Sequence, residues 1–165
     1  MKNLRNYCLL LLAAMITTTA SFAHGRSTII LIRHAEKAST SGDPILSKDG
    51  FKRAAALPEA FAPYKPDLFY STDTKRTRQT LATWSKSTGK ELSIYDAAKQ
   101  DELAKELLLM QDRTIVVVGH SNTIPQLVNL LIGANTYTDM AENEFNKAYI
   151  ITVEHGHATA VVKEY

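Results

Sequence analysis

Thr28-Ile29-Ile30-Leu31-Ile32-Arg33-His34 is a short apolar run, rich in β-branched residues, that ends in an arginine and a histidine. A second run, Ile115-Val116-Val117-Val118, leads into Gly119-His120. Apolar runs of this length and composition predict buried strands. Open α/β sheets bind ligands outside the carboxyl ends of their strands, so two histidines delivered there predict one shared site. The arginine beside the first histidine indicates chemistry on an anion.

Strand-like and helix-like segments alternate along the chain. Strands are expected over residues 28–32, 66–71, 91–95 and 114–119, and helices over 51–57, 73–87, 101–110 and 122–132. Pro58 should kink or end the first helix, and Asp73 should cap the second. Residues 148–154 and 158–162 flank Gly156 and predict a hairpin. We expect an α/β fold, a three-layer α/β/α sandwich with a mostly parallel central sheet and a C-terminal antiparallel hairpin.

The first 23 residues have the layout of a secretory signal peptide. Lys2 and Arg5 form a short positive region, and the apolar stretch of residues 7–16 is too short to span a bilayer. Ser21 and Ala23 place small side chains before a cleavage site. We predict a signal peptide over 1–23, a single domain over 24–165, and a periplasmic or secreted location.

Composition gives no support for nucleic acid, membrane or thiol chemistry in the predicted domain. Without residues 1–23, the remaining 142 residues carry 17 basic and 17 acidic side chains. A neutral domain gives no argument for nucleic acid or membrane surfaces as partners, and it leaves the oligomeric state open. The only cysteine, Cys8, lies in the predicted leader, so the domain is expected to use neither disulfides nor thiol chemistry.

Four short motifs accompany the two strand-end histidines. They are Arg33-His34-Ala35-Glu36-Lys37, Leu46-Ser47 with Gly50 and Arg53-Ala54, Arg76-Thr77-Arg78-Gln79-Thr80, and Gly119-His120-Ser121-Asn122. In this order, and over nearly the whole predicted domain, they resemble the motifs of the histidine phosphatase superfamily, also called phosphoglycerate-mutase-like. The resemblance implies that His34 is the catalytic nucleophile. It also implies that Arg33, Arg76 and His120 surround the phosphate.

The chemistry of these side chains agrees with the roles that the resemblance implies. An imidazole is a good nucleophile at neutral pH, and it forms a phosphoramidate that water can cleave. Guanidinium groups stay charged and bond two phosphate oxygens at once. Arg78 lies about 200° around the helix from Arg76, so we assign it a structural or rim role. We therefore expect an exported histidine acid-type phosphatase, a phosphoric monoester hydrolase with a phosphohistidine intermediate on His34. Its substrates would be small phosphomonoesters or phosphoramidates, with no cofactor and no metal.

The proton donor for the leaving group is ambiguous in the sequence. Asp96 follows the third predicted strand, where an acid could reach the pocket, and we take it as the catalytic acid. Asp101, Glu102 and Glu36 are further candidates. A good leaving group would need no acid.

Two other functions remain as alternatives. A non-catalytic phosphate-binding protein on the same fold is supported only by the lack of an obvious acid. A metal protein could use His120, His155 and His157, but His155-Gly156-His157 is more simply explained as the tip of the hairpin, because glycine supplies the turn.

Overall fold

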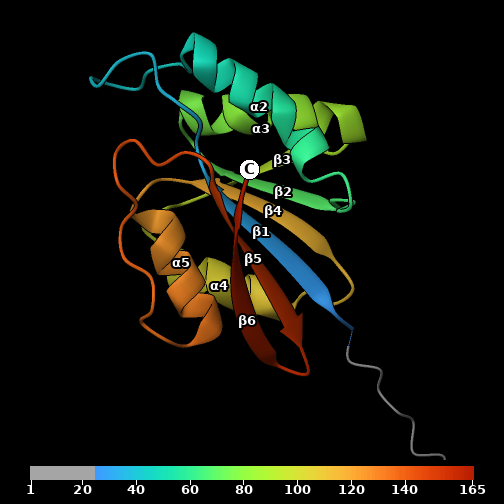
Figure 1. Cartoon of the computed structure of the whole chain (residues 1–165). Helices are drawn as coiled ribbons and strands as arrows, with labels where there is room; N and C mark the ends of the chain where they lie inside the picture. The colour runs from blue at the N-terminus through green and yellow to red at the C-terminus, as the bar shows by residue number, and fades with distance from the viewer. Residues whose placement is uncertain (1–24) are drawn as a thin grey trace, which may run out of the picture.

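The computed structural model describes residues 25–165, so the predicted signal peptide and its cleavage site lie outside the described residues. These residues form a six-stranded sheet with the order β3-β2-β4-β1-β5-β6 (Figure 1). Its strands are β1 (Ser27–Arg33), β2 (Leu68–Thr72), β3 (Leu92–Tyr95), β4 (Thr114–Gly119), β5 (Lys147–Glu154) and β6 (His157–Glu164). The helices are α2 (Lys48–Ala60), α3 (Lys75–Thr88), α4 (Gln100–Leu109) and α5 (Thr123–Ile132).

The sheet is parallel except at one edge. Strands β3, β2, β4 and β1 run parallel, whereas β5 is antiparallel to β1 and forms a hairpin with β6. Helices α2 and α3 cover one face and α4 and α5 cover the other (Figure 1). The expected three-layer α/β/α fold with its C-terminal hairpin is therefore confirmed. None of the helices within residues 25–165 has the length and apolar character needed to cross a membrane.

The central strand β1 is buried on both faces, which explains its uninterrupted apolar sequence. Ile29 and Leu31 pack into the core under α4 and α5, while Ile30 and Ile32 pack into the core under α2 and α3. Side chains alternate between the two faces of a strand, and both faces of β1 are covered, so each isoleucine or leucine of this run is fully buried. Burial of one such side chain contributes about 1.5–3 kcal/mol. This burial holds the strand that carries Arg33 and His34.

Two local predictions need correction. The cap of α3 is Thr74 rather than Asp73, because the Thr74 hydroxyl accepts the Thr77 N–H and the Asp73 carboxylate pairs with Arg78 instead. Of the two outcomes expected at Pro58, a kink or an end of the helix, the second is wrong, because α2 continues to residue 60. A proline in the last turn removes only one hydrogen bond of the helix, so the cost is small enough for packing to overcome.

The turn of the β5–β6 hairpin lies at the amino ends of the parallel strands, whereas His120 lies at their carboxyl ends. His155 and Gly156 adopt positive φ angles of 53° and 78°, as expected for the tip of the hairpin. Since Val153 pairs with Ser27 at the amino end of β1, this turn is remote from the carboxyl ends of the parallel strands. His155 and His157 therefore cannot join His120 around one metal ion.

Candidate active site

The two predicted histidines meet because β1 and β4 are neighbours. Arg33 pairs in register with Gly119, and the His34 N–H donates to the Gly119 carbonyl at 2.9 Å. The next residue of each strand is then a histidine, and the two imidazole rings lie 5.5 Å apart at 64°. The sheet thus brings both histidines to one edge, as the sequence predicted.

His34 is held in the tautomer that a nucleophile needs. Its Nδ1 lies 2.8 Å from the Ala35 carbonyl, which can only accept, so Nδ1 carries the proton and Nε2 has the free lone pair. The side chain is only 4% exposed. The pKa of His34 is lowered to about 4, mainly by burial; the hydrogen bond to the Ala35 carbonyl acts against this, and Arg76, His120 and Arg33 act with it. The imidazole is therefore neutral at neutral pH, and Nε2 can attack an electrophile.

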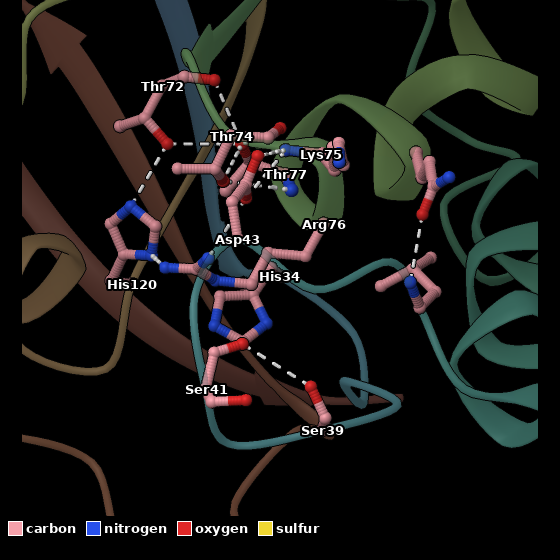
Figure 2. A network of polar contacts seen from close by, with 12 residues as sticks. His34, Ser39, Ser41, Asp43, Thr72, Thr74, Lys75, Arg76, Thr77 and His120 are labelled. Carbon is pink, nitrogen blue, oxygen red and sulfur yellow. Dashed lines mark hydrogen bonds and ion pairs between the residues drawn. The ribbon is translucent and has the colours of Figure 1, made fainter.

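Arg76 extends from the first turn of α3 towards both imidazoles. Figure 2 shows its guanidinium reaching His120 beside the His34 ring. Its Nη2 lies 3.3 Å from His120 Nδ1, and its Nη1 lies 3.4 Å from Asp43 Oδ1. The Asp43 carboxylate also accepts the Lys75 N–H at the start of α3, so it occupies a position where an anion is favoured.

His120 is bonded through both ring nitrogens. Besides the contact of Nδ1 with Arg76, its Nε2 lies 3.0 Å from the Thr72 hydroxyl at the end of β2. The pKa of His120 is lowered to about 4, mainly by burial and also by Arg76 and Arg33, while Asp43 acts in the opposite direction. A neutral His120 can give or take a hydrogen bond within the site.

Arg33 is a buried anchor as well as a member of the site. Its Nη1 donates to the carbonyls of Ala141 at 2.7 Å and Glu144 at 3.1 Å, and its guanidinium lies 4.2 Å from the centre of the Phe145 ring. Burial lowers the pKa of Arg33, although Glu142 and Glu144 raise it. Arg33 therefore ties the connection between α5 and β5 to the site.

The charge and the unused donors of this cluster suit an anion. The Nε atoms of Arg33 and Arg76 are buried, and neither has a hydrogen-bond partner within residues 25–165. Buried polar groups normally have partners, so these donors point to a ligand that accepts several hydrogen bonds. A phosphoryl group meets that requirement. The part of the chain that the structure describes contains no cluster of His, Cys, Asp or Glu placed to hold a metal ion.

Asp96 lies at the rim of the site. It shares a hollow of about 380 Å³ with His120 and Thr72. Its side chain is exposed and its Oδ1 accepts the Ala98 N–H at 2.9 Å. The alternatives lie further along the same edge: Glu102 lines an adjoining hollow that Asp96 also lines, while Asp101 lines neither.

Glu36 and Arg78 have partners outside the anion position. Glu36 accepts three hydrogen bonds from Arg53, the shortest 2.7 Å. Burial alone would raise the pKa of Glu36, but the hydrogen bonds from Arg53 outweigh it, and the pKa lies below its ordinary value. Glu36 is thus an ionised partner of Arg53 and a poor proton donor. Arg78 is exposed and pairs with Asp73, in agreement with its expected structural role.

Sequence reasoning missed three contributors to the site: Asp43, Thr72 and Phe145. Asp43 belongs to a polar loop without a periodic pattern, and Phe145 follows α5 by a long connection. Thr72 carries a usable signal, because it ends a predicted strand beside the strand of His120.

The fold and the site define an α/β protein in which two strand-end histidines and two arginines lie together at the carboxyl ends of the parallel strands. The family model described as the histidine phosphatase superfamily (branch 1) matches residues 29–104, a range that includes His34 and Arg76. Over these residues the chain is similar to the histidine phosphatase superfamily. No curated protein gives a significant sequence match.

Solved structures share the fold at low sequence identity. A mycobacterial glucosyl-3-phosphoglycerate phosphatase with inorganic phosphate matches with a TM-score of 0.69 and 16% identity, covering 84% of this chain and 97% of its own. A phosphoserine phosphatase from Entamoeba histolytica with 3-phosphoglyceric acid gives 0.67 and 17%, covering 84% and 98%. A protein described as the phosphohistidine phosphatase SixA from Agrobacterium tumefaciens gives 0.62 and 20%, covering 86% and 99%.

Proposed function

We propose that this chain is an exported phosphatase that hydrolyses small phosphomonoesters or phosphoramidates through a phosphohistidine on His34. The observation that carries the proposal is the position of the His34 ring, which contacts the Ala35 carbonyl through Nδ1 and lies beside the His120 ring. The Nδ1 of His34 is fixed on the Ala35 carbonyl, so Nε2 is left as a nucleophile beside Arg76 and His120. The structural relatives that hold phosphate or 3-phosphoglyceric acid support a small phosphorylated substrate.

In the first step, His34 Nε2 attacks the phosphorus atom and the bond from phosphorus to the leaving oxygen breaks. Negative charge spreads over the three remaining oxygens, where the guanidinium groups of Arg33 and Arg76 and the ring of His120 stabilise it. Arg33 is already held in place by its hydrogen bond to the Ala141 carbonyl, so its charge is positioned before the substrate binds.

The leaving oxygen requires a proton, and we assign Asp96 as its source. The Asp96 carboxyl lines the hollow next to His120, where a leaving group has room. In the second step, a water oxygen bonds to phosphorus, the bond from phosphorus to Nε2 breaks, and Asp96 takes the proton from water. One ester and one water thus give one alcohol and one phosphate, and the enzyme is restored.

The test of the proposal is hydrolysis of 4-nitrophenyl phosphate by purified protein over a broad pH range. We expect turnover by the wild type, loss of turnover in His34→Ala, and wild-type turnover in His157→Ala, which removes an exposed histidine at the far edge of the sheet. Equal rates for the wild type and His34→Ala would reject the proposal. Phosphate binding by calorimetry without turnover would favour the non-catalytic alternative.

The role of Asp96 is tested by the choice of leaving group. An aryl oxide leaves without a proton and an alkoxide does not, so Asp96→Asn should slow an alkyl phosphate by about 10²–10⁴-fold and change the aryl phosphate little. Asp101→Asn, which neutralises an exposed carboxylate of α4, serves as the control. Equal slowing of both substrates would remove Asp96 from this role.

Export rests on residues 1–23 and is tested separately. Full-length protein expressed in a bacterial host should be recovered from the periplasm or medium with His24 as its first residue. Recovery of uncleaved protein from the cytoplasm alone would reject this part of the proposal.

A further inference from the structure

The Thr72 hydroxyl connects His120 to a second buried hydroxyl. Thr72 ends β2, and its Oγ1 lies 3.0 Å from His120 Nε2 and 3.1 Å from Thr77 Oγ1 (Figure 2). The Thr77 hydroxyl in turn lies 2.9 Å from the Thr72 carbonyl and 2.8 Å from Thr74 Oγ1. Thr72 and Thr77 are both buried, so their hydrogen bonds are protected from water.

The groups at the two ends of this series of hydrogen bonds decide which atom donates in each bond. A guanidinium can only donate, so the contact with Arg76 requires that His120 Nδ1 accepts. A neutral His120 then has its proton on Nε2 and donates it to Thr72 Oγ1. The Thr72 hydroxyl donates to Thr77, and Thr77 donates to a backbone carbonyl. Every donor in this arrangement has an acceptor.

With a phosphoryl group bound, His120 would have to donate from Nδ1 and accept at Nε2, the reverse of the unliganded arrangement. Nδ1 is the ring nitrogen of His120 on the side of Arg76, and a phosphoryl oxygen there can only accept hydrogen bonds. A lone pair on Nδ1 would repel that oxygen, whereas an N–H would stabilise it. A hydroxyl can donate as well as accept, so Thr72 is able to donate to Nε2 once the proton is on Nδ1.

We propose that Thr72 is a positioning residue that sets the tautomer of His120, accepting from Nε2 in the unliganded enzyme and donating to Nε2 when Nδ1 donates to the phosphoryl group. The inference rests on the proposed function, because it assigns His120 to the transferred group. The change removes one proton from Nε2 and adds one to Nδ1 by exchange with solvent, since His120 is half-buried beside an open hollow. The total number of protons on the enzyme is unchanged.

The charged groups around His120 favour such an exchange over uptake of a second proton. Arg76 faces the ring from α3, and Arg33 and His34 face it from the end of β1. Burial disfavours an imidazolium most, Arg76 and Arg33 add to this effect, and Asp43, from the loop before α2, opposes it. Both tautomers of a neutral ring remain available, and the neighbour of Nε2 decides between them.

The kinetic test compares Thr72→Val with Thr72→Ser on 4-nitrophenyl phosphate. Valine keeps the shape and the β-branch but leaves Nε2 without a partner, so kcat/KM should fall about tenfold to a hundredfold. Serine restores the hydroxyl and should stay within about threefold of the wild type. Ser71→Ala is the matched control, because it removes the adjacent buried hydroxyl, which bonds the Thr72 carbonyl and does not contact His120.

A second readout does not need turnover. In ¹⁵N spectra of the wild type, Nδ1 of His120 should be unprotonated in the free protein and protonated with inorganic phosphate bound. In Thr72→Val, Nδ1 of His120 should no longer change from fully unprotonated to fully protonated when phosphate binds. In Ser71→Ala this change should be the same as in the wild type. An Nδ1 that stays unprotonated with phosphate, or a Thr72→Val variant with wild-type kcat/KM, would overturn the inference. A wild type without turnover would instead reject the proposed function, and the spectra would still decide the role of Thr72.

Discussion

Replacement of Gly50 by alanine should displace the backbone near His34, because Gly50 packs against the loop that follows this histidine. Gly50 is buried in the first turn of α2, and a Cβ there would lie 2.2 Å from the Glu36 carbonyl oxygen. Reaching the 3.4 Å of an ordinary contact requires a movement of 1.2 Å. The obstacle is backbone, so no side-chain rotation can relieve it. Because Glu36 follows His34 by two residues, we expect His34 to move as well.

Two opposing effects decide the stability of Gly50→Ala. Alanine in a helix gains about 0.5–1 kcal/mol over glycine, whereas overpacking costs about 1–3 kcal/mol. The clash should win, so the free energy of unfolding measured with urea should be lower in the variant by about 1–2 kcal/mol. A displacement near 1 Å should also lower kcat on 4-nitrophenyl phosphate by about 10²-fold.

The control for Gly50→Ala is Ala56→Gly on the exposed side of the same helix. This change costs about 1 kcal/mol of helix propensity with no contact to the site, so its activity should stay at the wild-type level. Wild-type activity in Gly50→Ala, or an equal loss of activity in both variants, would refute the reasoning about the Glu36 carbonyl.

Two further predictions concern charge. The pKa values of His34 and His120, about 4 when folded, lie below the ordinary 6.5, so the unfolded chain binds more protons in that window. Stability should therefore be lost as the pH falls from 6.5 to 4. Over this range the thermal midpoint should fall less in His34→Asn than in the wild type. An equal fall of the midpoint in both proteins would contradict this. Asp43 contacts the guanidinium of Arg76, so Asp43→Asn should strengthen inhibition by inorganic phosphate several-fold, with Glu154→Gln as the distant control; weaker inhibition would contradict it.

The sequence predicts the strands and the meeting of the histidines for one physical reason. Residues 29–32 and 115–118 are buried on both faces of the sheet, and such strands require uninterrupted apolar residues. Parallel neighbours end at one edge, so the residues that follow them, His34 and His120, must lie close together. These features depend on local composition and a general property of sheets.

Contacts set by tertiary packing are harder to predict. The sequence predicts that Arg33 binds phosphate, and the structure adds its contacts with Ala141 and Glu144. These contacts join residues more than 100 positions apart, and spacing carries no signal of them. Asp73 and Thr74 are both good caps, and local propensity cannot separate them. The ion pair of Asp73 with Arg78 decides the matter, because it removes the Asp73 carboxylate from the start of α3.

The covalent intermediate on His34 is the central claim, and trapping it is the most direct measurement. Wild-type protein would be mixed with 4-nitrophenyl phosphate, quenched within the first turnover under alkaline denaturing conditions that preserve phosphohistidine, and digested for peptide mass spectrometry. We predict one phosphoryl group on His34 in the wild type and none in His34→Ala. Steady turnover with unmodified His34, or a phosphoryl group on another residue, would contradict the account.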